Sequence, residues 1–243
     1  MVVASVLSVE GLSYAYPGGV SALRDVTFRI GPSERVALLG ANGAGKSTLL
    51  WCLVGILRAE GRVMVGGTEL APGKETEVRK LLGLAFSEPE DQLFMPTVVR
   101  DLAFGPRAAG FPPPVALEKA RAAAEQVGLD EALLERPPHE LSSGERRRAA
   151  LAAVLTLEPQ VLALDEPSNN LDARGRAALA QTLARLPCAQ LIATHDLDFV
   201  ARVCSRGLVL MEGMLAADEN LPALLDDGDR LVEYGLLAAQ EAR

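Results

Sequence analysis

The sequence contains few of the residues that mark disulfide-rich or metal-binding proteins. Its 243 residues include three cysteines, two histidines and one tryptophan, and aromatic residues make up 4% of the chain. Cys52, Cys188 and Cys204 lie far apart without metal-ligand spacing, and an odd number argues against a disulfide framework. We therefore expect buried, unreactive thiols in a reducing compartment.

Long hydrophobic runs and an excess of basic charge are also missing. No run approaches the ~18 apolar residues of a membrane span, since the longest candidates are Ala149–Leu157 and Leu49–Leu57. The first ten residues lack the basic stretch and apolar core of a secretory signal. A net charge of −8 argues against a nucleic-acid binder, although a local basic patch stays compatible with it. We expect a soluble chain that reaches a membrane only through a partner.

Residues 40–48 carry the pattern Gly-x-x-x-x-Gly-Lys-Ser between an apolar strand, Arg35–Leu39, and an apolar helix that follows. Glycines permit backbone angles that side chains forbid, so successive N–H groups can surround an anion at the helix N-terminus. Lys46 is predicted to serve the outer phosphates, and the Ser47 hydroxyl to serve Mg²⁺. The predicted nucleotide-binding residues here are Gly40, Ala41, Asn42, Gly43, Ala44, Gly45, Lys46, Ser47 and Thr48.

Two later apolar strands end in polar residues. Val161–Leu164 leads into Asp165 and Glu166, and Ala189–Thr194 leads into His195. Ligands of parallel sheets lie at the carboxyl edge, so Asp165 is predicted to hold Mg²⁺ and Glu166 to point at an attacking water. Adjacent acids also begin helices, but the phosphate loop upstream favours catalysis. His195 fits either a helix start or contact with a terminal phosphate.

Residues 97–157 have a mainly helical pattern, inserted between two α/β halves, with helices expected over Val98–Phe104, Val115–Val127 and Glu145–Leu157. Ser142 and Glu145 have capping-box spacing, and a capped helix start is an anion site whose partner the residues leave open, solvent included. The arginine run that follows is typical of a solvated helix face.

Before the phosphate loop, Val6–Glu10 and Val26–Ile30 read as strands, joined through a turn that carries Tyr14 and Tyr16. One of these tyrosines can stack on a base, or its ring can pack on the turn, and composition favours packing.

The order of these motifs, with Gln92 and Leu141–Glu145 among them, resembles the ATP-binding-cassette (ABC) ATPases from Leu7 to about Leu215. The resemblance implies an α/β P-loop NTPase fold with a mostly parallel central sheet, an N-terminal antiparallel β subdomain and an inserted α-helical subdomain. It predicts a single domain, 1–243, with an ATP-binding core at 1–96 and 158–215, a helical subdomain at 97–157 and a tail at 216–243.

The same resemblance assigns roles to individual residues. It implies that Tyr16 stacks on adenine, that Lys46, Glu166 and His195 are catalytic, and that Gln92 joins Ser47 and Asp165 at Mg²⁺. A signature at Ser142, Ser143, Gly144 and Glu145 would contact the γ-phosphate bound by a second subunit, and a loop at Ser168, Asn169, Asn170, Leu171 and Asp172 would cross the dimer interface. Ser143 stands where the family usually has glycine, and Glu145 where many members have glutamine.

Residues Glu90–Val98 and Phe104–Pro106 resemble the energy-coupling-factor branch, which includes cobalt- and nickel-type importers of micronutrients. This implies ATP and Mg²⁺ as cofactors and an integral membrane transporter subunit that docks on Gln92, Leu93, Phe94 and Met95. It also implies a homodimer, or a heterodimer with a related ATPase, on the cytoplasmic face of the cell membrane. Two alternatives stay open: a soluble ABC ATPase that serves a protein assembly such as iron–sulfur cluster assembly, and a nucleotide sensor without turnover, against which Glu166 and His195 argue.

Overall fold

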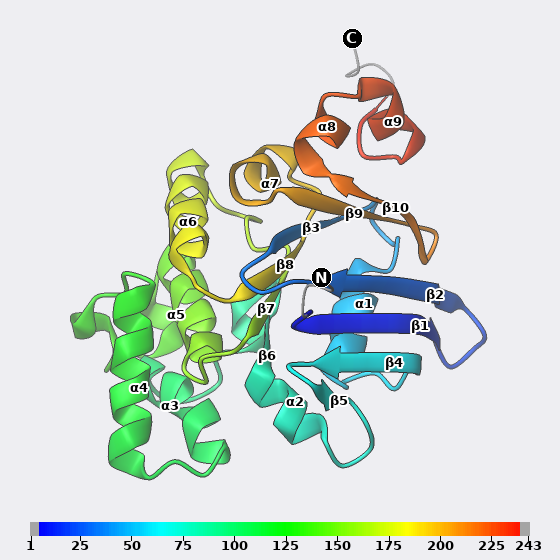
Figure 1. Ribbon diagram of the computed structural model, residues 1–243. Helices are drawn as coiled ribbons and strands as arrows, with labels where there is room; N and C mark the ends of the chain where they lie inside the picture. The colour runs from blue at the N-terminus through cyan, green and yellow to red at the C-terminus, as the bar shows by residue number, and fades with distance from the viewer. Residues whose placement is uncertain (1–4, 239–243) are drawn as a thin grey trace.

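The computed structural model describes residues 5–238, which form two sheets with helices packed around the larger one (Figure 1). The smaller sheet is antiparallel, in the order β2-β1-β4-β5. The main sheet has the order β10-β9-β3-β8-β7-β6, and its strands are parallel except β10, which runs antiparallel to β9. The strands are β1 (Leu7–Ala15), β2 (Ser21–Ile30), β3 (Arg35–Leu39), β4 (Glu60–Val65), β5 (Thr68–Glu69), β6 (Leu82–Ala85), β7 (Val161–Asp165), β8 (Ala189–Ala193), β9 (Arg206–Met211) and β10 (Met214–Asn220).

The helices follow the expected alternation with parallel strands. They are α1 (Lys46–Leu53), α2 (Glu75–Leu81), α3 (Val98–Ala108), α4 (Pro113–Gln126), α5 (Ser143–Leu155), α6 (Ala173–Arg185), α7 (Leu197–Val203), α8 (Leu221–Leu225) and α9 (Gly228–Glu233), with 3-10 turns η1 (Pro89–Asp91), η2 (Glu131–Leu133) and η3 (Pro138–Glu140). None of these helices is long and apolar enough to span a membrane within residues 5–238. The predicted fold class, a mostly parallel sheet with an antiparallel β subdomain and a helical insert, is confirmed.

The strands of the main sheet are apolar throughout because both of their faces are buried. In β3, Val36 and Leu38 pack with α1 and the smaller sheet, whereas Ala37 and Leu39 pack with the helices on the other face. Side chains alternate between the faces of a strand, so a strand covered on both sides reads as one continuous apolar run. This is why the sequence located β3 to the residue.

Helix α1 lies between the two sheets. Leu49, Leu50 and Leu53 are fully buried in the same core cluster as residues of both sheets. Burial of each leucine contributes roughly 1.5–3 kcal/mol, which fixes the helix with its N-terminus at the end of β3. The anchoring of this short helix positions the phosphate loop in front of it.

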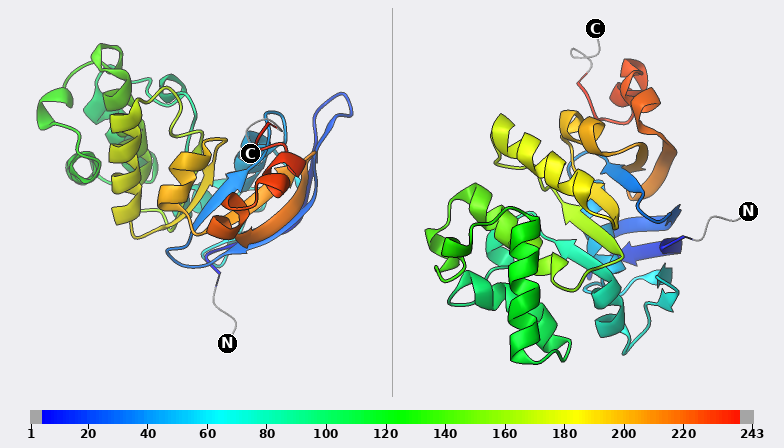
Figure 2. Two further views of the ribbon diagram at one scale, coloured as in Figure 1. Left: turned by 90° about the horizontal axis from the view of Figure 1, so that it is seen from above. Right: turned by 60° about the vertical axis from the view of Figure 1, so that its left-hand side comes forward.

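Helices α3, α4 and α5 form a group beside the β6 edge of the main sheet, separate from the smaller sheet (Figures 1 and 2). Ala116, Ala120 and Ala123 give α4 a face of small buried side chains, which lets it pack closely. Gly83 in β6 has the same effect at the sheet, because a Cβ there would overlap Val154 of α5. The helical group is thereby held against the strand that leads to Gln92.

Several elements differ from the sequence prediction. β10 pairs with β9 from Met214 to Asn220, so a tail that begins at residue 216 would divide a strand of the main sheet. α3 continues beyond Phe104 to Ala108, with Pro106 inside it. The prediction gave no helix for α6, whose apolar face is interrupted by small and polar residues, or for α7, which is only seven residues long. Residues 239–243 of the predicted tail lie outside the described residues.

Cys52 and Cys204 are buried, as expected, whereas Cys188 is half-buried. Burial raises the pKa of Cys52 and of Cys204 to about 12, and it also raises the pKa of Cys188. A thiolate is the reactive species, so these cysteines have a packing role.

Candidate functional site

Four strands of the main sheet bring the predicted catalytic residues to one edge. β3, β6, β7 and β8 are parallel neighbours and end at the same side of the sheet. The phosphate loop follows β3, Gln92 lies beyond β6, Glu166 follows β7 and His195 follows β8. Segments that are more than 100 residues apart in sequence therefore meet at this edge.

The phosphate loop curls tightly into α1. Gly45 has φ +107°, and a Cβ at this position would lie 2.7 Å from the carbonyl oxygen of Ala22, so only glycine fits. Lys46 is 6% exposed, and its Nζ donates to the carbonyl oxygens of Gly40 at 2.7 Å and Ala41 at 3.3 Å. Burial lowers the pKa of Lys46, while nearby carboxylates oppose this effect. The ammonium group is thus held inside the loop that would surround a phosphate.

Asp165 has the surroundings of a cation ligand. It is 4% exposed, its Oδ1 is buried with no hydrogen-bond partner within residues 5–238, and the Ser47 hydroxyl bonds to its carboxylate. Burial raises the pKa of Asp165; the Ser47 hydrogen bond opposes this, and the charge of Glu166 adds to it. A buried carboxylate oxygen without a donor, next to a serine hydroxyl, matches the oxygen ligands that Mg²⁺ prefers.

Glu166 is held from several sides. Its carboxylate accepts a hydrogen bond from Thr194 Oγ1 at 2.8 Å, lies 3.1 Å from His195 Nδ1 and is 3.8 Å from Lys46 Nζ. Its backbone has φ +44°, and its N–H donates to Ala193 at 2.8 Å. A left-handed glutamate costs energy that the surrounding bonds must offset, which is common at functional sites. The sequence prediction missed Thr194, although its position at the end of β8 pointed to this edge.

Tyr16 is fixed at the base of the phosphate-loop helix. Its hydroxyl lies 2.9 Å from Thr48 Oγ1, and its ring makes an edge-to-face contact with Tyr14, with centroids 5.0 Å apart. The half-buried ring therefore packs on the turn, as the simpler interpretation held. The contact with Thr48 also places it beside the phosphate loop, where the stacking role stays a prediction.

The predicted capping box is present at the start of α5. Ser142 Oγ accepts from the N–H of Glu145 at 3.4 Å, and the Glu145 carboxylate accepts from the N–H of Ser142 at 2.8 Å. Ser142 and Ser143 are exposed at this helix start. Ser143 needs no left-handed backbone, so a side chain is accommodated in this chain where the family has glycine.

The arginine run after the signature is not a solvated face, contrary to the prediction. Arg147 is buried, and it donates to the carbonyl oxygens of Glu166 at 3.4 Å and Asn169 at 3.1 Å. Arg146 pairs with Glu90 at 2.6 Å. No periodicity reveals this arrangement, because the partners lie on loops far away in sequence. The signature helix is thereby tied to the segment that follows β7.

The predicted interface loop is only partly exposed. Ser168 is buried and its hydroxyl has no partner among the described residues, and its predicted place at the dimer interface stays a prediction. Asn170 and Asp172 are exposed, while Asn169 and Leu171 are half-buried. Asn170 has φ +59°, a conformation that asparagine tolerates better than most residues, which gives the asparagine at this position a physical reason.

Gln92 faces inward. Its Nε2 donates to the carbonyl oxygen of Ala150 on α5 at 2.9 Å, and its Oε1 accepts from the N–H of Phe86 at 3.3 Å. Leu93 is 8% exposed and belongs to the core, whereas Gln92 is half-buried, and the part of these two residues in a docking groove stays a prediction. A leucine in a loop between two prolines is expected to be exposed, but Leu93 is buried in the same core cluster as residues of α3.

Phe94 is exposed, and Met95 next to it is half-buried. Phe94 is 62% exposed and stacks edge-to-face on Phe104, itself 45% exposed, with centroids 5.1 Å apart. The N–H groups of Phe94 and Met95 both donate to Asp101 Oδ1 at 2.9 Å, which fixes this short loop over α3. No sequence motif pointed to Asp101 in this role.

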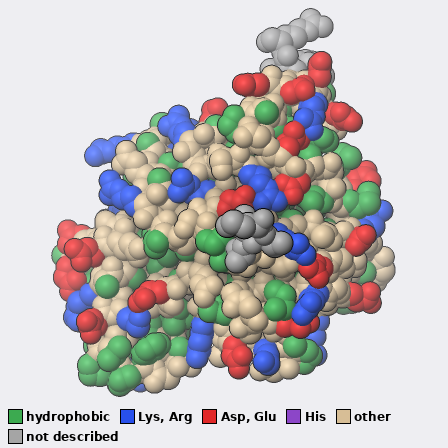
Figure 3. All heavy atoms as spheres, in the orientation of Figure 1, with side chains coloured by type: hydrophobic (Ala, Val, Ile, Leu, Met, Phe, Trp, Pro, Cys, Tyr) green, Lys and Arg blue, Asp and Glu red, His purple; other side chains and the backbone are tan. Residues whose placement is uncertain are grey.

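A hollow of about 680 Å³ lies next to these aromatic side chains, between α3 and α4. Met95, Phe104 and Leu117 give it an apolar lining, to which Arg100 and Arg107 add positive charge. Hydrophobic side chains also gather at the lower left of Figure 3, where α3 joins α4 and Phe111 is exposed. Exposed apolar surfaces of this kind are typical of sites that bind a protein, a membrane or a ligand.

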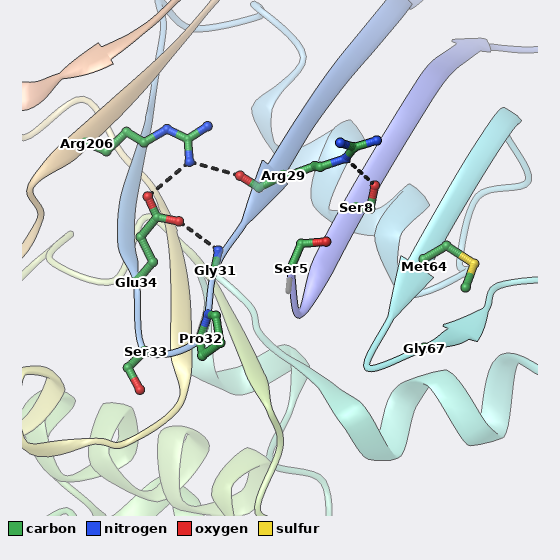
Figure 4. A pocket seen from close by; sticks show the side chains of 10 residues that line it. All are labelled: Ser5, Ser8, Arg29, Gly31, Pro32, Ser33, Glu34, Met64, Gly67 and Arg206. Atoms are coloured by element: carbon green, nitrogen blue, oxygen red, sulfur yellow. Dashed lines mark hydrogen bonds and ion pairs between the residues drawn. The ribbon is translucent and has the colours of Figure 1, made fainter. Parts of the chain in front are cut away.

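A second hollow, of about 930 Å³, lies at the opposite edge of the main sheet, where β3 and β9 begin (Figure 4). Arg206 donates to Glu34 at 3.0 Å and to the carbonyl oxygen of Arg29 at 2.9 Å, and it also pairs with Asp218 at 2.6 Å. Arg29 in turn donates to Ser8 at 3.2 Å. Because these charges satisfy one another and join the two sheets, the hollow has a structural role.

A phosphate loop at the end of a parallel strand, with two carboxylates and a histidine from neighbouring strands, defines a nucleoside triphosphatase of the P-loop class. The family model described as ABC transporter matches residues 23–169. The chain belongs to the ABC transporter family, as an ATP-binding subunit that hydrolyses ATP to drive transport.

Individual relatives agree with this assignment. An ABC transporter ATP-binding protein of Gloeobacter violaceus is 47% identical, with 95% of each chain covered. The cobalt import ATP-binding protein CbiO of Rhodobacter capsulatus is 38% identical, with 95% of this chain and 84% of that protein covered. The structure of CbiO1 from Clostridium perfringens, part of the transporter complex CbiONQ, matches with a TM-score of 0.82 and 32% identity over 98% of this chain and 97% of that chain.

Proposed function

We propose that the edge formed by β3, β7 and β8 hydrolyses Mg²⁺-bound ATP. The observation that supports this most directly is the buried Oδ1 of Asp165, which no described residue bonds, beside the Ser47 hydroxyl and near Lys46. Asp165 and Ser47 would hold the ion, which would neutralise phosphate charge when bound, and Lys46 with the loop N–H groups would hold the phosphates. Gln92 would join the ion through its Oε1, after release of the long hydrogen bond from Phe86.

Glu166 and His195 would carry out the hydrolytic step. Thr194 and the His195 ring fix the Glu166 carboxylate within 3.8 Å of Lys46, where the terminal phosphate would lie. From there Glu166 polarises the attacking water, and His195 steadies the phosphate that leaves. Such pre-positioned charges stabilise a transition state without reorganisation. The ring of Tyr16 would stack on the adenine.

A second copy, or a related ATPase, would complete each site. The phosphate loop follows β3 and the signature opens α5 beside β6, so the two lie on different parts of one chain (Figure 1). Ser142, Ser143, Gly144 and Glu145 would therefore close over ATP bound by the partner, and Asn170 and Asp172 would lie at the seam. ATP binding then joins the two subunits, and hydrolysis releases them.

We further propose that an integral membrane transporter subunit docks on Phe94, Met95 and Phe104 beside the hollow between α3 and α4. The exposed aromatic pair and the apolar lining suit an inserted apolar side chain of a partner helix. Similarity to cobalt-import and CbiONQ proteins supports import of a metal ion or vitamin. In that arrangement the chain lies on the cytoplasmic face of the cell membrane.

The hydrolytic assignment is tested with Glu166→Gln. This change keeps the shape of the side chain but removes the negative charge that polarises water, so phosphate release should fall by about 10²-fold or more. ATP should still bind, and dimer should accumulate in sedimentation velocity. Glu77→Gln, an exposed residue of α2, is the matched control and should keep wild-type turnover. Normal phosphate release in Glu166→Gln would remove Glu166 from its role.

The docking assignment is tested by pull-down from detergent-solubilised membranes of the native cells. We expect the wild-type chain to retain a multi-span membrane protein, identified by mass spectrometry, and Phe94→Ser to lose it. Ile56→Ser, which changes an exposed apolar residue outside the hollow, is the control and should retain the partner. Retention by Phe94→Ser, or capture of soluble assembly proteins only, would contradict this assignment and favour the protein-assembly alternative.

A further inference from the structure

The signature of this chain has an unusual hydrogen bond at its first residue. Ser142 Oγ donates to Glu145 Oε2 at 2.6 Å, in addition to the two bonds of the capping box. A serine hydroxyl has one proton and two lone pairs. With its proton directed to Glu145, the hydroxyl can offer an arriving phosphate only lone pairs, which repel phosphate oxygens.

We propose that Glu145 restrains the ATP-dependent pairing of two subunits by occupying the hydroxyl proton with which Ser142 would bind the γ-phosphate held by the other subunit. This inference rests on the proposed two-subunit site. It assigns Glu145 a positioning role, since the residue acts through Ser142.

Glutamate restrains subunit pairing in this way and glutamine does not, because a carboxylate only accepts hydrogen bonds whereas an amide also donates them. Both Glu145 oxygens are acceptors, so the carboxylate draws the Ser142 proton toward itself. A glutamine at this position would accept the N–H of Ser142 through Oε1 and donate through Nε2 to Ser142 Oγ. The hydroxyl proton would then be free to point at a phosphate, and the capping box would persist.

The charges around Glu145 favour the ionised form. The hydrogen bonds from Ser142 lower the pKa of Glu145, and Arg148 and Arg136 lower it further. Arg148 lies along the helix at the signature, with its Nη1 3.8 Å from the place where a Cβ on Gly144 would be. The carboxylate therefore remains negative at the helix start that a partner-bound triphosphate approaches, and adds repulsion to the loss of a donor.

The size of the restraint follows from the hydrogen bond between Ser142 and Glu145, which must be exchanged for one between Ser142 and the γ-phosphate. A hydrogen bond to a charged group corresponds to about tenfold in an equilibrium constant. A homodimer has two signatures, so replacement of Glu145 in both copies should tighten ATP-dependent pairing by about 100-fold.

The test measures the dimer dissociation constant at saturating Mg²⁺ and ATP by analytical ultracentrifugation, with every variant in the Glu166→Gln background so that ATP persists. Glu145→Gln should lower this constant by about 100-fold. Glu140→Gln, at the exposed neighbouring turn η3, removes the same charge and should change it by less than about threefold. Melting curves of the nucleotide-free proteins verify that each variant is folded.

A double-mutant cycle separates the proton effect from simple charge removal. Ser142→Ala should weaken pairing about 100-fold when Glu145 is replaced by Gln, because the hydroxyl then donates, and much less when Glu145 is present. Equal effects of Ser142→Ala in both backgrounds would overturn the inference, as would unchanged or weaker pairing of Glu145→Gln. If no variant pairs on ATP, the two-subunit function itself fails, and this inference fails with it.

Discussion

Replacement of Asp165 by asparagine should make the nucleotide-free protein more stable while impairing Mg²⁺-ATP binding. Asp165 is 4% exposed, its Oδ1 has no partner among the described residues, and burial raises its pKa. The ionised carboxylate is thus costly in the folded state. Asparagine has nearly the same shape without the charge, so we expect a gain of about 1 kcal/mol in the free energy of unfolding.

The pH dependence of stability shows whether the ionised carboxylate of Asp165 stabilises or destabilises the folded state. Because the pKa of Asp165 is higher in the folded state than the unfolded value of about 3.9, the folded state binds the proton more tightly. The cost of the carboxylate therefore grows as the pH rises above about 3.9 and is complete above the folded-state pKa. The stability difference between Asp165→Asn and the wild type should be full at neutral pH and disappear toward pH 4.

Differential scanning calorimetry with a chelator measures this effect. A gain of about 1 kcal/mol raises the melting temperature by about 2–4 °C for a chain of this size. Mg²⁺ and ATP at about 100 times the wild-type dissociation constant should reverse the order, since they stabilise the wild type by about 2.7 kcal/mol and the variant less. Asp91→Asn, at an exposed position, is the control. A lower melting temperature of Asp165→Asn at neutral pH would refute the reasoning.

Three other changes test neighbouring parts of the structure. Lys46→Ala should weaken ATP binding at least about tenfold in a fluorescent-nucleotide titration, because it removes the one cation inside the loop described here; unchanged affinity would contradict the phosphate-loop assignment. Asn170→Val should cost about 1–2 kcal/mol in urea unfolding and Asn170→Gly much less, since valine resists φ +59°; equal costs would show that this backbone strain is unimportant. Asp101→Ala should lose the membrane partner and Asp101→Asn should retain it, because the amide oxygen can still accept from Phe94 and Met95; equal retention in pull-downs would exclude Asp101 from shaping the docking surface.

The sequence predicted those features that depend on neighbouring residues. β3 and the helix after it were recognisable because burial on both faces leaves a continuous apolar run before the glycine loop. The capping box of Ser142 and Glu145 follows from a spacing of three residues. Both patterns involve residues close together in sequence, so they could be recognised without knowledge of the tertiary contacts.

Features set by long-range contacts could not be predicted in this way. The burial of Arg147 depends on carbonyl groups of the segment after β7, and the burial of Leu93 depends on space beneath α3. β10 alternates exposed and half-buried side chains, a weak signal that the acidic residues of this strand obscure further. In each case the deciding partner is distant in sequence.

The buried guanidinium of Arg147 has a mechanical consequence. It bonds to carbonyl oxygens on both sides of Pro167 and Ser168, so α5 cannot shift relative to the main sheet without breaking these bonds or carrying that backbone along. A displacement of the outer helices by a membrane protein would therefore be transmitted through Arg147 to the backbone at Glu166. This transmission does not require contact with the nucleotide.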